Sequence, residues 1–107
     1  MADAPTGNVE VHFDEASNRF EARLADTDDV AFLEVVPGDK IWTLVHTEVP
    51  ASFRGRGVGS QLVKAALSHV RGAGLTVRPI CPFVLDYLRE NPAEVDVVNP
   101  RYAHLLE

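Results

Sequence analysis

The residues with the clearest chemical meaning are three glycines and two arginines in one short run, Arg54-Gly55-Arg56-Gly57-Val58-Gly59. Glycines at alternate positions let a backbone turn sharply and approach a ligand with no Cβ in the way. Backbone N–H groups at the start of a helix, together with arginine side chains, favour an anion such as a diphosphate. We therefore predict a phosphate-binding turn here. The simpler alternative is a glycine-rich turn that only starts a helix.

Two common phosphate-binding patterns do not fit this run. A Walker loop needs a lysine directly after its glycines, and none follows here. A dinucleotide-binding fingerprint needs a glycine at position 60, which is Ser60 in this chain. The run therefore predicts an anion site of a different kind.

Two groups that can carry a proton stand just before this run. His46 and Glu48 lie two residues apart, so on a strand they share one face. Either group can take a proton directly or through water. The structural alternatives are a solvated carboxylate for Glu48 and, for His46, a histidine packed beside Trp42.

Four strands are expected before the glycine run, over residues 9–13, 20–24, 30–36 and 41–49. Polar turns separate them at 14–18, 25–29 and 37–39. The nearly continuous apolar run Val30–Val36 predicts a strand covered on both faces. Alternation in the fourth strand predicts one face with Trp42, Leu44, His46 and Glu48, and the other with Ile41, Thr43, Val45, Thr47 and Val49.

One main amphipathic helix is expected after the run, because apolar residues recur at helical spacing from Val58 to Val70. Gly72 and Gly74 end it. A fifth strand is expected over 75–81. Pro79 cannot donate a hydrogen bond there, which indicates that this strand is unpaired on at least one side.

Short helical segments are expected at the C-terminal end. Residues from Phe83 to Leu88 suit a short helix that ends before Pro92. Asn99 and Pro100 resemble an N-cap followed by a first helical residue, opening a last turn through Leu106. The elements together predict an α/β fold, with α and β parts in layers.

The length of 107 residues suits one domain, which we place at 9–107 after a flexible tail at 1–8. No apolar run is long enough to span a bilayer, and the acidic N-terminus does not read as a signal peptide. The single cysteine, Cys81, cannot form an internal disulfide. A soluble, cytoplasmic protein with no membrane partner is therefore expected.

The net charge of −6 is unevenly divided along the chain. Residues 1–50 carry eleven acidic and three basic residues, whereas residues 51–107 carry five acidic and seven basic ones. An acidic surface repels nucleic acids and attracts cationic partners, and a basic half suits a small anion. The alternative is charge that serves solubility and clusters at random.

Three segments together resemble the GCN5-related N-acetyltransferases, the GNAT superfamily, and within it a minimal single-domain branch. They are the residues His46-Thr47-Glu48-Val49-Pro50, the glycine run, and Pro79-Ile80-Cys81-Pro82-Phe83-Val84. The resemblance covers roughly residues 9–106. It implies a mixed, mainly antiparallel five-stranded sheet with one main helix after the fourth strand and short C-terminal helices.

The resemblance also implies a site for acetyl-CoA, which is a co-substrate. The backbone from Arg54 to Gly59 would bind the pyrophosphate. Thr47, Glu48 and Val49 would pair like a strand with the amide groups of the pantetheine arm, where the fourth and fifth strands move apart. Pro79 suits such a place, because it cannot donate to a strand ladder. Many members have two helices between their first strands, but here the turn 14–18 is all that separates them.

Cys81 would then end the fifth strand close to the acetyl group, and three interpretations stay open. It is a small core residue, a general acid that protonates the leaving thiolate, or a nucleophile that forms an acetyl-cysteine after activation by Arg78 or a histidine. Direct transfer ranks before the covalent route. Tyr87 and Tyr102 are alternative acids or core aromatics. The remaining histidines show no metal-ligand spacing, so no metal is expected.

Three functions compete. The first is a small acetyltransferase that moves the acetyl group of acetyl-CoA to an amine, either a small amine or a protein lysine. The second is a CoA-binding module with little or no catalysis, a sensor or partner, which the missing acceptor helices suggest. The third is an arginine-glycine-rich nucleic-acid binder, which the charge of −6 and the few aromatic residues oppose. The first is preferred, as a monomer or weak homodimer.

Overall fold

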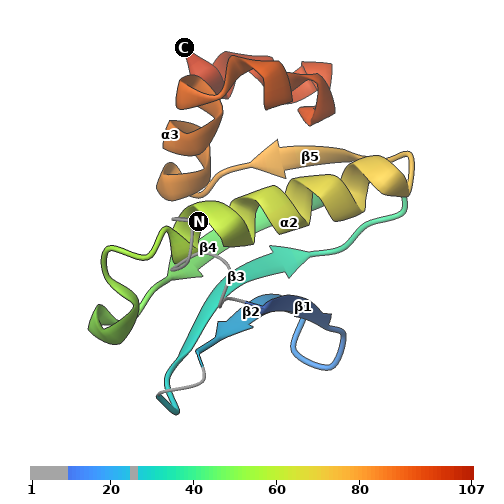
Figure 1. Ribbon diagram of the computed structural model, residues 1–107. Coiled ribbons are helices and arrows are strands. Elements are labelled where there is room, and N and C mark those ends of the chain that lie inside the picture. The colour runs from blue at the N-terminus through green and yellow to red at the C-terminus, as the bar shows by residue number, and fades with distance from the viewer. Residues whose placement is uncertain (1–9, 25–26) are drawn as a thin grey trace.

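The computed structural model describes residues 10–24 and 27–107 of the chain (Figure 1). Within them the strands are β1 (Glu10–Asp14), β2 (Arg19–Arg23), β3 (Val30–Val36), β4 (Ile41–Glu48) and β5 (Thr76–Pro79). The helical elements are η1 (Ala51–Phe53), α2 (Val58–Gly72), α3 (Pro82–Glu90), η2 (Pro92–Val97) and η3 (Pro100–Leu106). The expected tail at 1–8, Val9 and part of the expected turn at 25–29 lie outside the described residues.

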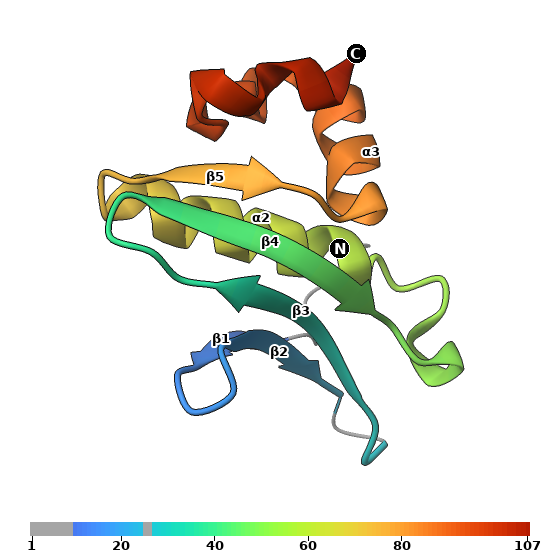
Figure 2. The same cartoon turned by 180° about the vertical axis from the view of Figure 1, so that it is seen from behind.

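One five-stranded sheet carries the strands in chain order, from β1 at one edge to β5 at the other. The first three pairings are antiparallel and the pairing of β4 with β5 is parallel. Parallel neighbours need a long crossover, and α2 provides it. The predicted mixed, mainly antiparallel α/β fold is therefore confirmed. Figure 2 shows the sheet in front of α2, with α3 and the C-terminal turns beyond the β5 edge.

The main helix buries one face against the sheet, as its apolar spacing predicts. It packs on β2 and β3, and its buried large side chains each contribute roughly 1.5–3 kcal/mol relative to exposure. The buried helix residues are Val58, Gly59, Leu62, Val63, Ala66, Leu67 and Val70. The sheet residues buried in the same core are Phe20, Ala22, Ala31, Leu33, Val35, Trp42 and Leu44.

β3 is covered by a helix on one face, so the prediction of cover on both faces is wrong. Ala31, Leu33 and Val35 are buried, but Val36 is 57% exposed. Phe32 is half-buried on the second face, where the guanidinium of Arg19 lies 4.1 Å from its ring centre. The apolar run reflects packing between neighbouring side chains of the sheet and not a second helical layer.

β4 contains a bulge at Val45, so the prediction of strict alternation along this strand is also wrong. β3 pairs Glu34 with His46 and Val35 with Leu44, which leaves Val45 without an opposite residue. An extra residue of this kind reverses which face the following side chains occupy. The reversal falls in the part of the strand that carries the candidate site residues.

The bulge changes which side of the sheet these residues share with Trp42 and Leu44: Thr47 joins their side, and His46 and Glu48 leave it. Thr47 is paired with the buried residue Leu33 and therefore lies on the α2 side of the sheet. His46 and Glu48 lie on the opposite, open face, where Glu48 is paired with Phe32. His46 accordingly does not pack beside Trp42. That position belongs to His69 of α2, whose ring centre is 5.1 Å from that of Trp42.

The C-terminal segments follow the predicted signals closely. β5 is shorter than the expected 75–81, and Pro79 is its last residue, paired with Leu44 of β4 and with no strand on its other side in the described part of the chain. The side chain of Asn99 caps η3 by accepting from the N–H of Arg101 at 3.0 Å. The turn η2 was not predicted.

No helix among the described residues is long and apolar enough to cross a membrane.

Candidate functional site

The glycine run forms the bend that leads from β4 into α2. Phe53, in η1, is 1% exposed and holds the start of the bend in the core. Gly55 has a φ of 79° and Gly57, the N-cap of α2, a φ of 69°. Side chains other than glycine rarely adopt such angles, which explains why glycines stand at these two positions. Arg54 is exposed and Arg56 half-buried.

The start of α2 offers backbone donors to an anion. The first hydrogen bond along the helix runs from the N–H of Gln61 to the carbonyl of Gly57, at 3.1 Å. The N–H groups of Val58, Gly59 and Ser60 thus have no partner inside the helix. The helix has neither a capping side chain nor an acidic residue in its first turn. Its positive end is therefore not neutralised by the helix itself, which favours a bound anion.

Phe83 contacts this bend and was missed as a site residue. A Cβ added to Gly59 would lie 2.6 Å from Cζ of Phe83, so only glycine lets this ring approach the helix so closely. The ring belongs to the first turn of α3 and is 42% exposed. The available signal was the position of Phe83 two residues after Cys81, in the third segment of the resemblance.

β4 and β5 stop pairing before β4 ends. The last paired residues are Leu44 and Pro79, and the N–H groups of Ile80 and Cys81 both donate to the carbonyl of Leu44, at 3.2 and 3.1 Å. Beyond this point β4 continues, while the chain that follows β5 leaves it toward α3 (Figure 2). The final residues of β4, from His46 to Glu48, therefore have a strand partner on the β3 side and not on the β5 side.

Thr47 and Cys81 face each other across the parting strands. Sγ of Cys81 lies 3.4 Å from Oγ1 of Thr47, and either atom can be the donor. Cys81 is 3% exposed and is the N-cap of α3, with Pro82 as the first helical residue. The guanidinium of Arg78, proposed to activate the thiol, lies instead 5.3 Å from the ring centre of Tyr102.

His46 and Glu48 form a close pair on the open face of the sheet. Nε2 of His46 lies 3.2 Å from Oε1 of Glu48, and the two side chains are 55% and 62% exposed. The ring of His46 also contacts that of Phe32 edge-on, with centres 6.2 Å apart. Their expected place on one face is confirmed, and the pair is open to solvent.

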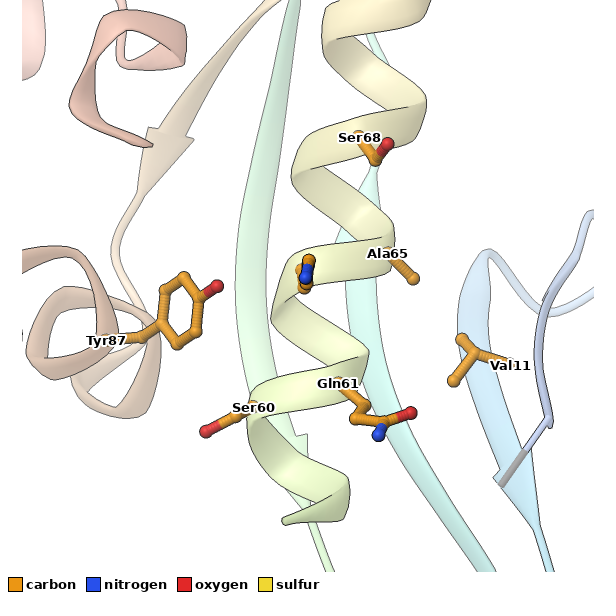
Figure 3. A pocket seen from close by; sticks show the side chains of 7 residues that line it. Val11, Ser60, Gln61, Ala65, Ser68 and Tyr87 are labelled. Atoms are coloured by element: carbon orange, nitrogen blue, oxygen red, sulfur yellow. The ribbon is translucent and has the colours of Figure 1, made fainter. Parts of the chain in front are cut away.

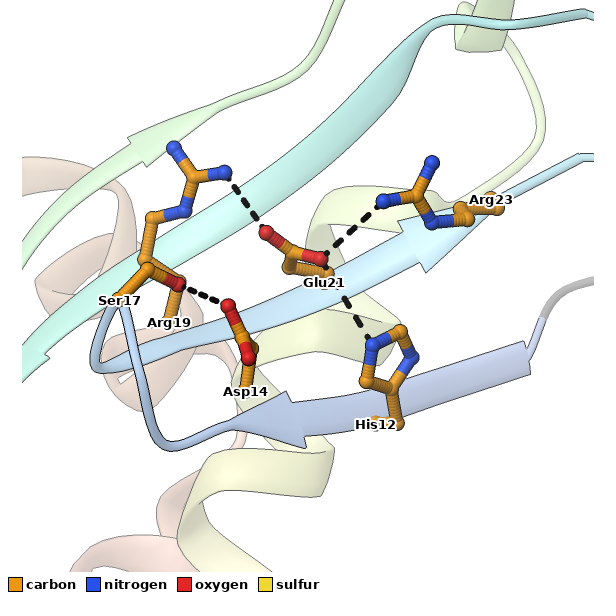
Figure 4. Close-up of polar contacts among 6 residues, drawn as sticks. All are labelled: His12, Asp14, Ser17, Arg19, Glu21 and Arg23. Atoms are coloured by element: carbon orange, nitrogen blue, oxygen red, sulfur yellow. Dashed lines mark hydrogen bonds and ion pairs between the residues drawn. The ribbon is translucent and has the colours of Figure 1, made fainter.

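A buried carboxylate lies on the same face of the sheet, beyond Phe32 on the neighbouring strand β2. Glu21 of β2 is 5% exposed, and Figure 4 shows it among Arg19, Arg23 and His12. The distances from its carboxylate oxygens are 2.7 Å to Arg19, 3.4 Å to Arg23 and 3.6 Å to Nε2 of His12. The neutralising contacts hold Arg19 over Phe32 and so fix the surface next to His46.

A cavity of about 480 Å³ runs beside the first turns of α2 (Figure 3). Its lining includes Ser60, Gln61, Lys64 and Tyr87. The hydroxyl of Tyr87 donates to Glu94 at 3.2 Å, and burial, followed by the charge of Glu94, raises the pKa of Tyr87. Neither Tyr87 nor Tyr102 forms a hydrogen bond, ion pair or ring contact with Thr47, Cys81, His46 or Glu48. In the described part of the chain no group of His, Cys, Asp or Glu side chains could hold a metal ion.

The fold and the site define a GNAT-type domain, and comparison with known proteins agrees. A family model described as GCN5-related N-acetyl-transferase matches residues 19–97, from the first residue of β2 to the last of η2. The chain therefore belongs to this family, as the resemblance predicted.

Individual relatives come from several vertebrates. The chain is similar to Protein NATD1 of Xenopus tropicalis, 39% identical over 90 residues that make up 82% of each chain. It is 40% identical over 88 residues to Protein NATD1 of Mus musculus, covering 80% of this chain and 79% of the relative. For Protein NATD1 of Homo sapiens the identity is 40% over 86 residues, covering 78% and 75%.

Proposed function

We propose that this protein binds acetyl-CoA and transfers its acetyl group to an amine. The observation that carries the proposal is the parting of β4 from β5 beyond Leu44 and Pro79. It leaves the backbone of Thr47, Glu48 and Val49 available to the amide groups of the pantetheine arm, as a strand partner would be. Val49 and Ile80, which follow the two strands, are 36% and 41% exposed and suit the methylene groups of that arm.

The bend from Arg54 to Gly59 is the proposed pyrophosphate site. The N–H groups at the start of α2 point to an anion, and the arginine side chains add positive charge. Gly55 supports close approach, because a Cβ built there meets nothing within 4 Å and so points into open space. Lys64, on the next turn of the helix and lining the neighbouring cavity, suits the 3′-phosphate of CoA.

The proposed reaction uses the two faces of β4 separately. The amine nitrogen attacks the thioester carbon from the open face, and His46 or Glu48 takes the proton that the nitrogen loses. The carbon–sulfur bond then breaks, and the CoA thiolate takes a proton. Cys81 and the Thr47 hydroxyl beside it lie on the α2 side, where they can supply that proton. Because the base and the acid lie on opposite faces of β4, no proton passes directly from one to the other.

The covalent route is the second option at the same site. The Cys81 thiolate would attack the thioester, form an acetyl-cysteine and release CoA, and the amine would then take the acetyl group from sulfur. Cys81 is 3% exposed and contacts Thr47. The direct route ranks first because it needs only a proton from this pair and not attack by the sulfur on the acetyl carbon.

Binding and turnover are tested in sequence. A thermal-shift titration with acetyl-CoA is expected to stabilise the protein, by about 2.7 kcal/mol at 100 times Kd. Release of CoA thiol is then followed with a panel of small amines and lysine peptides. Absence of any shift contradicts the whole proposal. A shift without turnover supports instead the CoA-binding module, which the short connection between β1 and β2 favours, since only residues 15–18 separate the two strands.

The intact mass of the protein after incubation with acetyl-CoA separates the two routes. Direct transfer predicts no acetylated species that depends on position 81, and Cys81→Ala then retains part of its turnover. The covalent route predicts a species heavier by one acetyl group that disappears in Cys81→Ala. Thr47→Val is the matched variant, because it removes the hydroxyl beside Cys81 and leaves the thiol in place.

A further inference from the structure

A second cavity lies at the end of the sheet away from the glycine bend. Its volume is about 370 Å³, and its walls come from the end of β1, the β1–β2 turn, the turn after β3, the start of β4 and the last turn of α2. The lining residues are Phe13, Glu15, Asn18, Pro37, Trp42 and His69. His69 lies eleven residues after Val58 in α2, which corresponds to roughly 16 Å along the helix axis. The cavity is thus distinct from the proposed acetyl-transfer site.

Three of the lining side chains are aromatic rings in mutual contact. The ring centres of Phe13 and Trp42 are 5.4 Å apart, those of Trp42 and His69 5.1 Å, and those of Phe13 and His69 5.5 Å. The rings are tilted by 45°, 42° and 39° to one another. Rings tilted in this way do not cover one another's faces as parallel stacked rings do. His69 is exposed, Phe13 is half-buried and Trp42 is 9% exposed, so the three rings line one cavity with part of their surface open to it.

The charge of the lining is negative. Glu15 is exposed on the β1–β2 turn, and among the described residues its carboxylate has no hydrogen-bond or ion-pair partner. Its titratable companion in the lining is His69, and neither lysine nor arginine lines the cavity. Aromatic faces and an unneutralised carboxylate both attract a cation.

The same lining discriminates between kinds of cation. A metal ion or a primary ammonium group keeps its hydration shell strongly and needs several oxygen ligands in exchange for it. Here the polar side chains apart from the histidine are Glu15 and Asn18. A methylated ammonium group holds water weakly, carries its charge on methyl groups and fits aromatic surfaces. We propose that this cavity binds a methylated ammonium group.

The experiment uses the full chain and its single tryptophan, Trp42, as the reporter. Tryptophan fluorescence is followed during titration with choline chloride, with sodium chloride at equal ionic strength as the salt control. The matched ligand is 3,3-dimethyl-1-butanol, which has the shape of choline without the charge. We expect a saturable change with choline at concentrations about tenfold lower than with the neutral analogue. Equal responses to both ligands, or no saturable response to choline, overturn the proposal.

Two variants test the residues behind the attraction. Glu15→Gln is expected to weaken choline binding about threefold to tenfold, and Glu10→Gln, an exposed carboxylate on the same hairpin, to leave it unchanged. Phe13→Leu keeps an apolar side chain but removes a ring, and is expected to weaken binding by at least about fivefold. Unchanged affinity in both Glu15→Gln and Phe13→Leu contradicts the assignment, and unfolding curves verify that each variant is folded.

The ligand's source is distinguished in the same titration. Free Nε-trimethyl-lysine and choline represent a modified protein side chain and a small metabolite, and tighter binding of either one supports the proposal. Unmethylated lysine is the negative control. Lysine that binds as tightly as trimethyl-lysine contradicts it, because the methyl groups would then contribute nothing.

Discussion

At Gly55, the effect of a substitution on backbone conformation can be measured separately from its effect on ligand binding. Its φ of 79° strains any other side chain, but the space around its Cβ position is open. Gly74, after the end of α2, has the same character, with a φ of 76° and nothing within 4 Å. Gly55→Ala and Gly74→Ala therefore carry a similar conformational cost, roughly 1–2 kcal/mol each.

We expect only the first of these variants to lose affinity for acetyl-CoA. Alanine at position 55 places a methyl group where the pyrophosphate is proposed to lie, and at least a tenfold rise in Kd, about 1.4 kcal/mol, is expected. Calorimetric titration of both variants with acetyl-CoA measures the difference in Kd. Thermal unfolding verifies that the two variants are destabilised to a similar extent. Equal affinities would place the phosphate site elsewhere.

His46 and Glu48 are expected to act as one unit in catalysis. Their atoms lie 3.2 Å apart, so removing either side chain disturbs the same proton transfer. We expect His46→Gln and Glu48→Gln each to lower kcat by about 100-fold, with little change in Kd for acetyl-CoA, and the double variant to lose little more. Steady-state rates of the three variants test this. Losses that multiply in the double variant would show two independent roles.

At the scale of single elements, the glycine bend could be predicted but the division of β4 could not. The bend depends on residue types that are restrictive in themselves, such as Gly57 at a left-handed N-cap. Val45, by contrast, fits an alternating strand as well as any β-branched residue. Its place in a bulge is decided by the partners of β4, which are β5 from Ile41 to Leu44 and β3 from Thr43 to Glu48. Such pairing is set by tertiary structure, so local spacing placed Thr47 on the wrong face.

The contact between α2 and α3 yields a prediction for a pair of variants. Alanine at position 59 improves helix propensity by up to about 1 kcal/mol, but its Cβ would meet the Phe83 ring at 2.6 Å. In the parent protein we expect Gly59→Ala to be neutral or destabilising, because the ring must move. In a Phe83→Ala background the same change is expected to stabilise. Urea unfolding of the four proteins gives the coupling between the two sites. An equal effect of Gly59→Ala in both backgrounds would contradict a tight contact.

For the whole molecule, short turns made the order of the sheet predictable, since strands joined by short connections are usually neighbours. What covers the second face of the sheet was harder to predict. The apolar residue Phe32 suggested a second covering layer, but the side chain of Arg19 covers its ring instead. An arginine that lies along an aromatic ring buries apolar surface without a helix, and single-residue hydropathy does not register that.

The C-terminal part of the molecule is joined to α2 by a polar network centred on Arg71. Its guanidinium lies 3.1 Å from Glu94 and 2.9 Å from Asp96, both in η2. The hydrogen bond from Arg71 lowers the pKa of Asp96 below its ordinary 3.8, against a smaller opposing effect of desolvation. The contact therefore stabilises the folded state when Asp96 is ionised, and unfolding must give it up.

The direction of the shift fixes how stability depends on pH. A folded-state pKa below the unfolded one gives a contribution that is complete above about pH 4 and is lost as the pH falls through the folded pKa. We expect Asp96→Asn to lower the melting temperature at neutral pH, and the difference from the parent protein to close below pH 4. In an Arg71→Gln background the same substitution should have a much smaller pH-dependent effect, because the main cause of the lowered pKa is gone. Thermal unfolding of the four proteins across this range measures the coupling. A difference that persists unchanged into acid would mean that Asp96 stabilises the C-terminal part through its shape and not through its charge.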